Sequence, residues 1–184
     1  HRAQPLLVNL DMLAAENNSA VVTGILDIRY NVGDYNGMIV LGQDQKQNVT
    51  GSYDYYQTNR YRKHHLLPIG EFVPFEQLLR DLAPFFDLPN SSFSRGDWQQ
   101  TNLSAKGLNL LPALCFEIAF PRQIQANFTA TTDLLLTVSN DAWFGDSIGP
   151  WQHLQIAQMR ALEFGRPLLR ATNTGVTAIV NADG

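Results

Sequence analysis

The spacing of apolar residues in the first half of the chain predicts strands flanked by helices. Within residues 5–16, apolar side chains recur at helical spacing, at Leu6, Leu10, Leu13 and Ala14. Further apolar or aromatic runs are separated by the turn-rich residues 31–37, a pattern typical of strands. We therefore expect a helix at 5–16, strands at 20–28, 38–41 and 53–63, and a second helix at 75–82.

The second half of the chain alternates short apolar runs with helical segments. Continuous apolar runs of this kind suit strands that are buried on both faces, and a proline is favourable in the first turn of a helix. The sequence predicts strands at 108–114, 134–138, 168–171 and 176–180, and helices that begin near Pro121 and Pro150. On the second of these helices the apolar face is Leu154, Ala157, Ala161 and Phe164. Strands alternating with helices predict a layered α/β architecture.

Length, charge and cysteine content narrow the classes of protein. With 184 residues, 45% of them hydrophobic, the chain can form one domain over residues 1–184. Its formal net charge of −4, without a basic cluster, argues against a nucleic-acid partner. The single cysteine, Cys115, cannot form an internal disulfide. No stretch approaches the roughly 18–20 apolar residues needed to cross a bilayer, so the chain alone is expected to be soluble.

The two ends of the chain suggest a piece of a longer protein. The sequence begins at His1, and Asp183-Gly184 closely follows the apolar run 176–180. An Asp-Gly pair after a strand is a hairpin signal. We therefore expect a partner strand after Gly184.

Cys115 is a candidate nucleophile because it ends a predicted buried strand. A sharp turn at this position holds a side chain out, while nearby backbone N–H groups can bind an oxyanion. A cysteine in an apolar run is also a common small core residue. Position alone favours the core interpretation.

Two separated segments favour catalysis instead. Residues 115–121 (CFEIAFP) resemble the cysteine segment of the nitrilase superfamily, and residues 61–66 (YRKHHL), followed by Gly70-Glu71, resemble its lysine segment. Further segments resemble the apolipoprotein N-acyltransferase family within it. They are 85–89 (FFDLP), 92–96 (SFSRG), 139–145 (SNDAWFG), 149–153 (GPWQH), 159–163 (MRALE) and 166–170 (RPLLR). The resemblance implies a nitrilase-like α-β-β-α sandwich.

The resemblance also implies catalytic roles. Cys115 matches the nucleophile, which a phospholipid acylates to a thioester, and Lys63 matches the lysine that stabilises the oxyanion and favours the thiolate. Glu71 and Glu117 match two acidic positions, and each could pair with Lys63. The third member of the glutamate-lysine-cysteine triad is expected upstream of His1, because Glu16 lacks the context of that glutamate.

Aromatic residues near the motifs are candidates for substrate binding. The resemblance places Phe116, where many members have tyrosine, together with Asn140, Trp143 and Phe144 around an acyl-chain pocket; a hydrophobic cap on the core is the alternative. The apolar segment 72–86 is a candidate lid. His64, His65 and His153 lack metal-ligand spacing, so neither a metal nor a cofactor is expected.

The implied enzyme transfers an acyl chain from a phospholipid, with phosphatidylethanolamine expected, to the N-terminal amine of a diacylated apolipoprotein. The resemblance places its catalytic domain on the periplasmic side of the inner membrane of a Gram-negative bacterium. Two alternatives remain: a soluble carbon-nitrogen hydrolase that cleaves amides or nitriles, and a non-catalytic binding domain.

Overall fold

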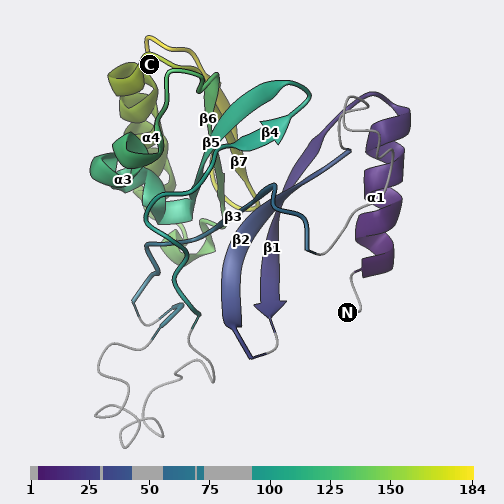
Figure 1. Ribbon diagram of the computed structural model, residues 1–184. Coiled ribbons are helices and arrows are strands. Elements are labelled where there is room, and N and C mark those ends of the chain that lie inside the picture. Colours follow the sequence, from purple (N-terminus) through teal and green to yellow (C-terminus); the bar gives the residue numbers. More distant parts are fainter. Residues whose placement is uncertain (1–3, 30, 43–55, 69, 73–92) are drawn as a thin grey trace, which may run out of the picture.

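The protein is a four-layer sandwich of helices and sheets (Figure 1). The computed structural model describes residues 4–29, 31–42, 56–68, 70–72 and 93–184. Two β-sheets pack against each other, with one helix outside the first sheet and two helices outside the second. The α-β-β-α order that the resemblance implied is confirmed. None of the helices in these ranges combines the length and the hydrophobicity that a transmembrane span requires.

Among the described residues, the first sheet consists of three antiparallel strands. They are β1 (Val21–Arg29), β2 (Gly33–Leu41) and β3 (Arg60–Arg62), with β2 in the middle. Successive residues of a strand point to opposite faces. Met38 and Val40 therefore pack toward the second sheet, whereas Ile39 and Leu41 pack toward the helix on the other side.

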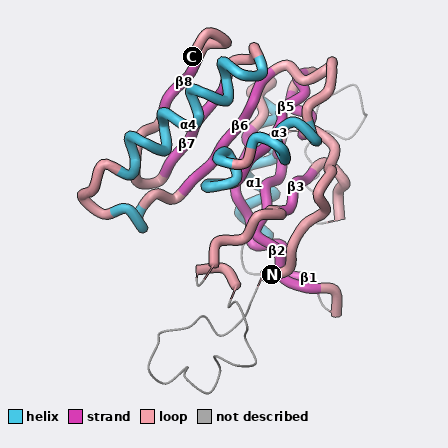
Figure 2. The backbone as a smooth tube through the Cα atoms, turned by 90° about the vertical axis from the view of Figure 1, so that its left-hand side faces the viewer, coloured by secondary structure: helices cyan, strands magenta, loops and turns pink. Residues whose placement is uncertain are grey.

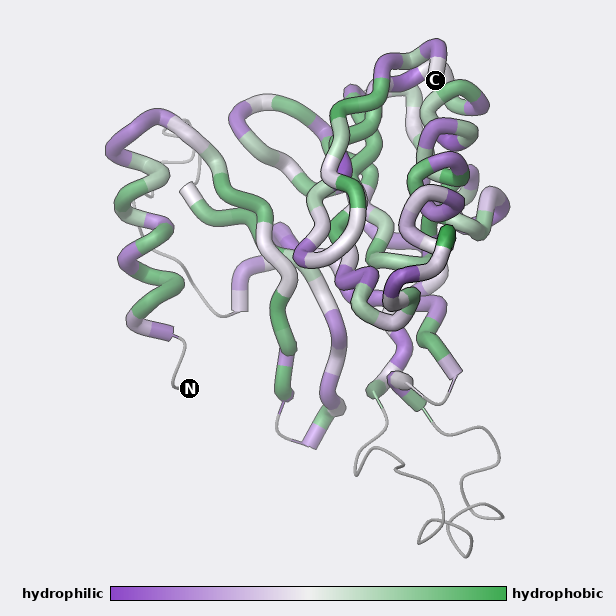
Figure 3. The backbone as a smooth tube through the Cα atoms, turned by 180° about the vertical axis from the view of Figure 1, so that it is seen from behind, coloured by the Kyte–Doolittle hydropathy of each residue, from purple (hydrophilic) through white to green (hydrophobic). Residues whose placement is uncertain are grey.

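Helix α1 (Gln4–Glu16) covers the outer face of the first sheet, and hydrophobic and hydrophilic stretches alternate along it (Figure 3). Its contacts with β2 come from Leu7, Val8 and Leu10. Leu6 and Leu13 belong to the predicted apolar series but are 61% and 56% exposed. Leu10 and Ala14 of the same series do lie on the buried face, and Ala14 is 5% exposed, so the buried face overlaps the predicted one and extends to Leu7 and Val8.

In the part of the chain that the structure describes, the second sheet has five strands, and the helices α3 (Pro121–Asn127) and α4 (Gly149–Phe164) cover its outer face (Figure 2). Strands β5, β6 and β7 are parallel, and an antiparallel strand closes each edge. In order across the sheet, the strands are β4 (Leu103–Ala105), β5 (Leu108–Leu114), β6 (Leu134–Ser139), β7 (Leu168–Thr172) and β8 (Ala178–Val180).

The main core lies on both faces of the second sheet, as expected for parallel strands. Toward the helices, Leu111 and Leu135 pack against Ala157 and Ala161 of α4. The predicted apolar face of this helix is confirmed, because Leu154 and Phe164 also pack there. The residues between the two sheets are Met38, Val40, Tyr61, Leu103, Ala105, Leu110, Leu114 and Leu136.

Most predicted elements are found within one or two residues of their expected bounds. The strand expected at 38–41 begins earlier, at Gly33, because residues 33–37 also pair with β1 instead of forming only a turn. The strand expected at 53–63 is shorter, because only Arg60–Arg62 pairs with β2 among the described residues of that segment. Strand β4 was not predicted. It is three residues long and is held by pairing with β5 across a turn in which Lys106 and Gly107 have φ of +51° and +81°. The helix expected at 75–82 lies outside the described residues.

Candidate active site

The carboxyl ends of the parallel strands meet at one edge of the second sheet, where ligands commonly bind in α/β folds. A cavity of about 880 Å³ opens there, which is within the usual range for ligand sites of about 300–1,000 Å³. Cys115 follows β5, Asn140 follows β6 and Asn173 follows β7, and all three line the cavity. The first sheet contributes an apolar part of the wall from β1: Val22, Ile25 and Leu26.

Cys115 occupies a strained turn at the end of β5. It begins the short 3₁₀ helix η3 (Cys115–Ala119), and its φ is +52°. A left-handed backbone costs a non-glycine residue roughly 1–2 kcal/mol, so the surrounding structure must hold it there. The side chain is partly exposed and reduced. A strained, accessible turn of this kind is how a nucleophile is presented to a cavity.

Lys63 lies directly after β3 and is 2% exposed. Its Nζ donates to Oε2 of Glu71 at 2.6 Å. Glu71 is itself held by Asn36, whose Nδ2 donates to Oε1 at 2.6 Å, and by the N–H of Leu67, which donates to Oε2 at 2.7 Å. Lys63, Glu71 and Cys115 all line the same cavity. The sheet packing thus brings a buried, oriented ammonium and a thiol to one site.

Glu117 has a different environment from Glu71 and is fully buried. Its Oε1 accepts the N–H groups of His64 at 2.7 Å and His65 at 3.0 Å, both in the lysine segment. Its Oε2 accepts the N–H of Leu114, immediately before Cys115, at 2.8 Å. Of the two acidic residues, Glu71 makes the pair with Lys63, while Glu117 ties the lysine segment to the cysteine turn.

A tyrosine and a glutamine complete the surroundings of Glu117. The hydroxyl of Tyr61 donates to Oε2 at 2.9 Å, and Nε2 of Gln123 donates to Oε1 at 3.3 Å. Burial raises the pKa of Tyr61, and the charge of Glu117 raises it further. The phenol therefore stays protonated and remains a donor to Glu117. Tyr61 is the first residue of the lysine segment, whereas Gln123 lies two residues beyond the end of the cysteine segment.

The predicted substrate-binding residues fall into two groups. Asn140 and Trp143 line the cavity, and the ring of Trp143 is 73% exposed. Phe116 and Phe144 are absent from the described lining. The Phe116 ring packs edge-on against Phe120, with centroids 4.7 Å apart, and the Phe144 ring lies 5.9 Å from that of His153. Except for Phe72, the candidate lid segment 72–86 lies outside the described residues.

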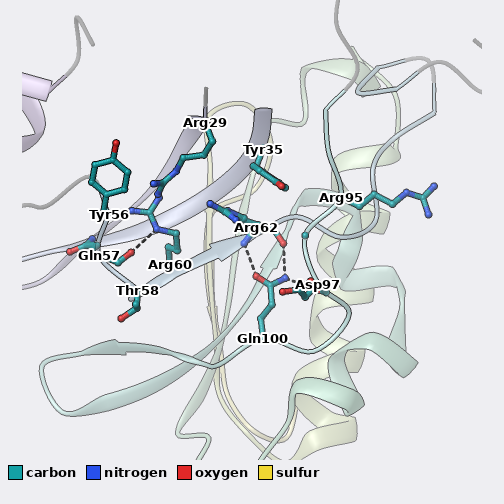
Figure 4. A pocket seen from close by; sticks show the side chains of 11 residues that line it. Arg29, Tyr35, Tyr56, Gln57, Thr58, Arg60, Arg62, Arg95, Asp97 and Gln100 are labelled. Atoms are coloured by element: carbon teal, nitrogen blue, oxygen red, sulfur yellow. Dashed lines mark hydrogen bonds between the residues drawn. The ribbon is translucent and has the colours of Figure 1, made fainter. Parts of the chain in front are cut away.

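A second cavity, of about 360 Å³, lies among arginines, and its described lining contains neither Cys115 nor Lys63 (Figure 4). Three of these arginines pair with Asp27, which is 1% exposed: Arg29 at 2.7 Å, Arg60 at 3.0 Å and Arg62 at 2.9 Å. Arg95 points away from the other three (Figure 4). The ion pairs join the end of β1 to β3 and so help to fix the strand that precedes Lys63.

The three histidines that lack metal-ligand spacing in the sequence contact other groups in the structure. His64 Nδ1 lies 2.7 Å from the Gly96 carbonyl oxygen, and the His65 ring stacks on Phe120 with centroids 3.9 Å apart. In the described part of the chain, no group of three or more His, Cys, Asp or Glu side chains is arranged to hold a metal ion. His153 belongs to a buried cluster with Asp141 and Arg170, which spacing did not reveal.

Comparison with known proteins agrees with this geometry. The chain is 57% identical over 178 residues to an apolipoprotein N-acyltransferase of Photobacterium profundum, covering 97% of this chain and 34% of that protein. It is also 57% identical over 182 residues to an apolipoprotein N-acyltransferase of Shewanella oneidensis, covering 98% of this chain and 35% of that protein. The chain thus spans about a third of the length of these relatives.

Solved structures with low sequence identity share the fold. An amidase from Nesterenkonia sp. is 18% identical, with a TM-score of 0.64, and the match covers 98% of this chain and 60% of that one. A carbon-nitrogen hydrolase from Helicobacter pylori is 16% identical, with a TM-score of 0.65, and the match covers 94% of this chain and 52% of that one. The sequence model of carbon-nitrogen hydrolases matches residues 2–184. The chain therefore belongs to the carbon-nitrogen hydrolase family.

Proposed function

We propose that this chain is the catalytic region of an acyltransferase that moves a fatty acyl group from a phospholipid to the N-terminal amine of diacylglyceryl-cysteine in an apolipoprotein. The observation that carries the proposal is the common cavity of Cys115 and the Lys63–Glu71 pair. That arrangement supports acyl chemistry on a thiol. The high identity to proteins named apolipoprotein N-acyltransferase supports a lipid donor and a lipoprotein acceptor.

In the first half-reaction, a base takes the thiol proton of Cys115 and the thiolate sulfur attacks the ester carbonyl of the phospholipid. The oxyanion of the tetrahedral intermediate is stabilised by the ammonium of Lys63, which Glu71 orients. Collapse of the intermediate breaks the ester C–O bond. The base returns its proton to the departing oxygen, so the lysophospholipid leaves with a free hydroxyl group. The base in this proposal is the glutamate expected upstream of His1.

In the second half-reaction, the free amine of the acceptor attacks the thioester carbonyl and forms a second tetrahedral intermediate at the same place. The C–S bond then breaks, the amide product forms, and the proton lost by the amine is taken up through the base by the Cys115 thiolate. The same ammonium serves both intermediates, so a single site supports a ping-pong scheme.

The walls of the cavity support a lipid donor. Val22, Ile25 and Leu26 from β1 and the Trp143 side chain are apolar and line the same cavity as Cys115 and Lys63. Removing acyl-chain surface from water contributes about 25 cal/mol per Å². The proposal includes phosphatidylethanolamine as donor and a periplasm-facing position at the inner membrane of a Gram-negative bacterium.

The test is to incubate the full-length protein with a phospholipid that carries a labelled acyl chain, and to look for label on the Cys115 peptide by mass spectrometry. We expect acylation of Cys115 without acceptor and transfer of the label when a diacylated lipopeptide is added. Acylation of a Cys115→Ala variant would overturn the assignment of the nucleophile. Release of free fatty acid without transfer to the lipopeptide would favour a hydrolase.

A further inference from the structure

Three ionisable side chains form a buried cluster directly behind the Cys115 turn. Asp141 follows β6, His153 is in the first turns of α4, and Arg170 is in the middle of β7. They are 2%, 4% and 2% exposed, respectively. Polar groups buried this far are costly unless they are hydrogen-bonded, so their contacts show what they hold in place.

Asp141 connects the other members of the cluster. Its Oδ2 accepts Nη2 of Arg170 at 2.7 Å, and its Oδ1 lies 3.0 Å from Nδ1 of His153. The hydroxyl of Ser139 also donates to Oδ1 at 2.6 Å. Burial lowers the pKa of the Arg170 guanidinium below its usual value, although the Asp141 carboxylate opposes this shift. The arginine is thus held in the cluster by its pairing with Asp141.

The other end of the His153 ring contacts the nucleophile residue itself. Its Nε2 lies 3.1 Å from the carbonyl oxygen of Cys115. A carbonyl oxygen only accepts hydrogen bonds, so Nε2 must carry a proton. This holds in both charge states: an imidazolium donates from Nδ1 to Asp141, and a neutral ring accepts at Nδ1 from Arg170, whose Nη2 lies 3.1 Å away.

The carbonyl that His153 holds belongs to the strained residue of the site. Cys115 has φ of +52°, which is unfavourable for an L-residue and persists only where its surroundings enforce it. The N–H before this residue is held by Glu117, and the carbonyl after its Cα is held by His153. The turn is therefore anchored on both sides of the thiol.

We propose that His153 is a positioning residue, which keeps the backbone of Cys115 in its left-handed conformation by donating a hydrogen bond to its carbonyl oxygen. Asp141 and Arg170 orient the ring and keep the proton on Nε2. This inference rests on the proposed role of Cys115 as nucleophile. It does not depend on the identity of the acyl donor or acceptor.

The test compares two variants of the full-length enzyme. His153→Gln keeps an N–H donor near the position of Nε2, whereas His153→Leu has similar bulk and no donor. Because displacement of a reacting group by about 1 Å can cost 100-fold in rate, we expect His153→Leu to lower kcat for acyl transfer by about 10- to 100-fold with KM for phospholipid nearly unchanged. His153→Gln should recover most of that loss. Gln155→Leu, on the exposed side of the same helix, should leave kcat unchanged.

A second measurement separates this proposal from the proposed function. Alkylation of Cys115 by iodoacetamide, followed by mass spectrometry, needs no lipid, and its rate should be altered in His153→Leu and close to wild type in His153→Gln. If alkylation follows this pattern while the wild-type protein transfers no acyl group, the positioning role stands and the acyltransferase assignment fails. Equal kcat values and equal alkylation rates in the Leu and Gln variants would overturn the positioning role.

Thermal unfolding of each variant shows whether the comparison is valid. If His153→Leu does not fold, the comparison uses Asp141→Asn, which keeps the volume and removes the charge that orients the ring. We expect Asp141→Asn to lower kcat by about 10-fold, because that is roughly the change in rate that corresponds to the free energy of one oriented hydrogen bond. An Asp141→Asn enzyme with wild-type kcat and alkylation rate would contradict the proposal.

Discussion

Replacing Glu117 with glutamine should destabilise the protein strongly, although the two side chains have the same shape. The carboxylate is fully buried and accepts hydrogen bonds on both oxygens: three donors face Oε1 and two face Oε2. A glutamine amide must turn its NH₂ group toward one of these sets. A donor would then face donors, in a place that is closed to water.

The orientation of the amide that leaves fewer buried groups unsatisfied sets the smallest loss in free energy of unfolding. With NH₂ toward the former Oε2 position, the Tyr61 hydroxyl can rotate and accept, but the N–H of Leu114 loses its acceptor. One unsatisfied buried N–H costs about 1–3 kcal/mol, and hydrogen bonds to a neutral oxygen are weaker than those to a charged one. We therefore expect Glu117→Gln to lower the free energy of unfolding by about 2–4 kcal/mol. In a domain of this size, that loss lowers Tm by about 4–16 °C.

Thermal unfolding, followed by tryptophan fluorescence, measures this difference, and the acyl-transfer rate is measured on the same samples. The matched control is Glu163→Gln on α4, where the carboxylate pairs with Arg160 and is 44% exposed. An exposed pair contributes little, so this Tm should change by about 1–2 °C at most. If Glu117→Gln unfolds at the same temperature as Glu163→Gln, Glu117 is not the link between the lysine segment and the cysteine turn.

Three further predictions test the site and its support. Burial raises the pKa of Asp27, but the three arginines around it lower the pKa more and hold it below 3.8. The ion pairs of the Asp27 carboxylate therefore stabilise the folded protein fully above the unfolded-state pKa, and this stabilisation is lost as pH falls through the folded-state pKa. The Tm difference between wild type and Asp27→Asn should therefore be large at pH 6 and shrink below about pH 4; a difference that does not change with pH would refute this. Glu71→Gln removes the charge that orients Lys63, so kcat for acyl transfer should fall by about 10- to 100-fold with a small change in KM; an unchanged kcat would show that the ion pair is not needed. A methyl group added at Gly96 would lie 2.2 Å from a backbone oxygen of β3, so Gly96→Ala should lower the free energy of unfolding by about 1–3 kcal/mol, more than Gly24→Ala, whose added methyl meets only a carbonyl oxygen at 3.9 Å.

The elements that local patterns predict well are those with their own periodic signal. The runs Leu108–Leu114 and Leu134–Ser139 are apolar because both faces of these strands are buried, and they were expected from that composition alone. Strand β4 and the short helices η3 and η4 (Ala142–Phe144) have no such signal. Three to five residues are too few for a period, and β4 is held by its neighbour in the sheet.

The two motifs contain the proposed reacting groups, but the packing of the sheets sets the geometry of these groups. Resemblance placed Cys115, Lys63 and Glu71 in one site. It could not distinguish the two acidic residues, because the difference is in their neighbours: Glu71 faces an ammonium, and Glu117 faces backbone N–H groups from two segments about fifty residues apart. Phe116 and Phe144 were assigned to the pocket by position in the sequence, and neither is in its described lining.

The sequence by itself therefore determined the class of fold, the order of strands and helices along the chain, and the chemical identity of the thiol and the ammonium. Hydrophobic periodicity and motif composition are local properties, so they can be read without knowing which segments meet. Only the tertiary structure showed that β1 lines the cavity, that Glu117 joins the two motifs by hydrogen bonds, and that His153 contacts the carbonyl oxygen of Cys115. These contacts join residues distant in the chain, and the packing of the two sheets and α4 sets their distances.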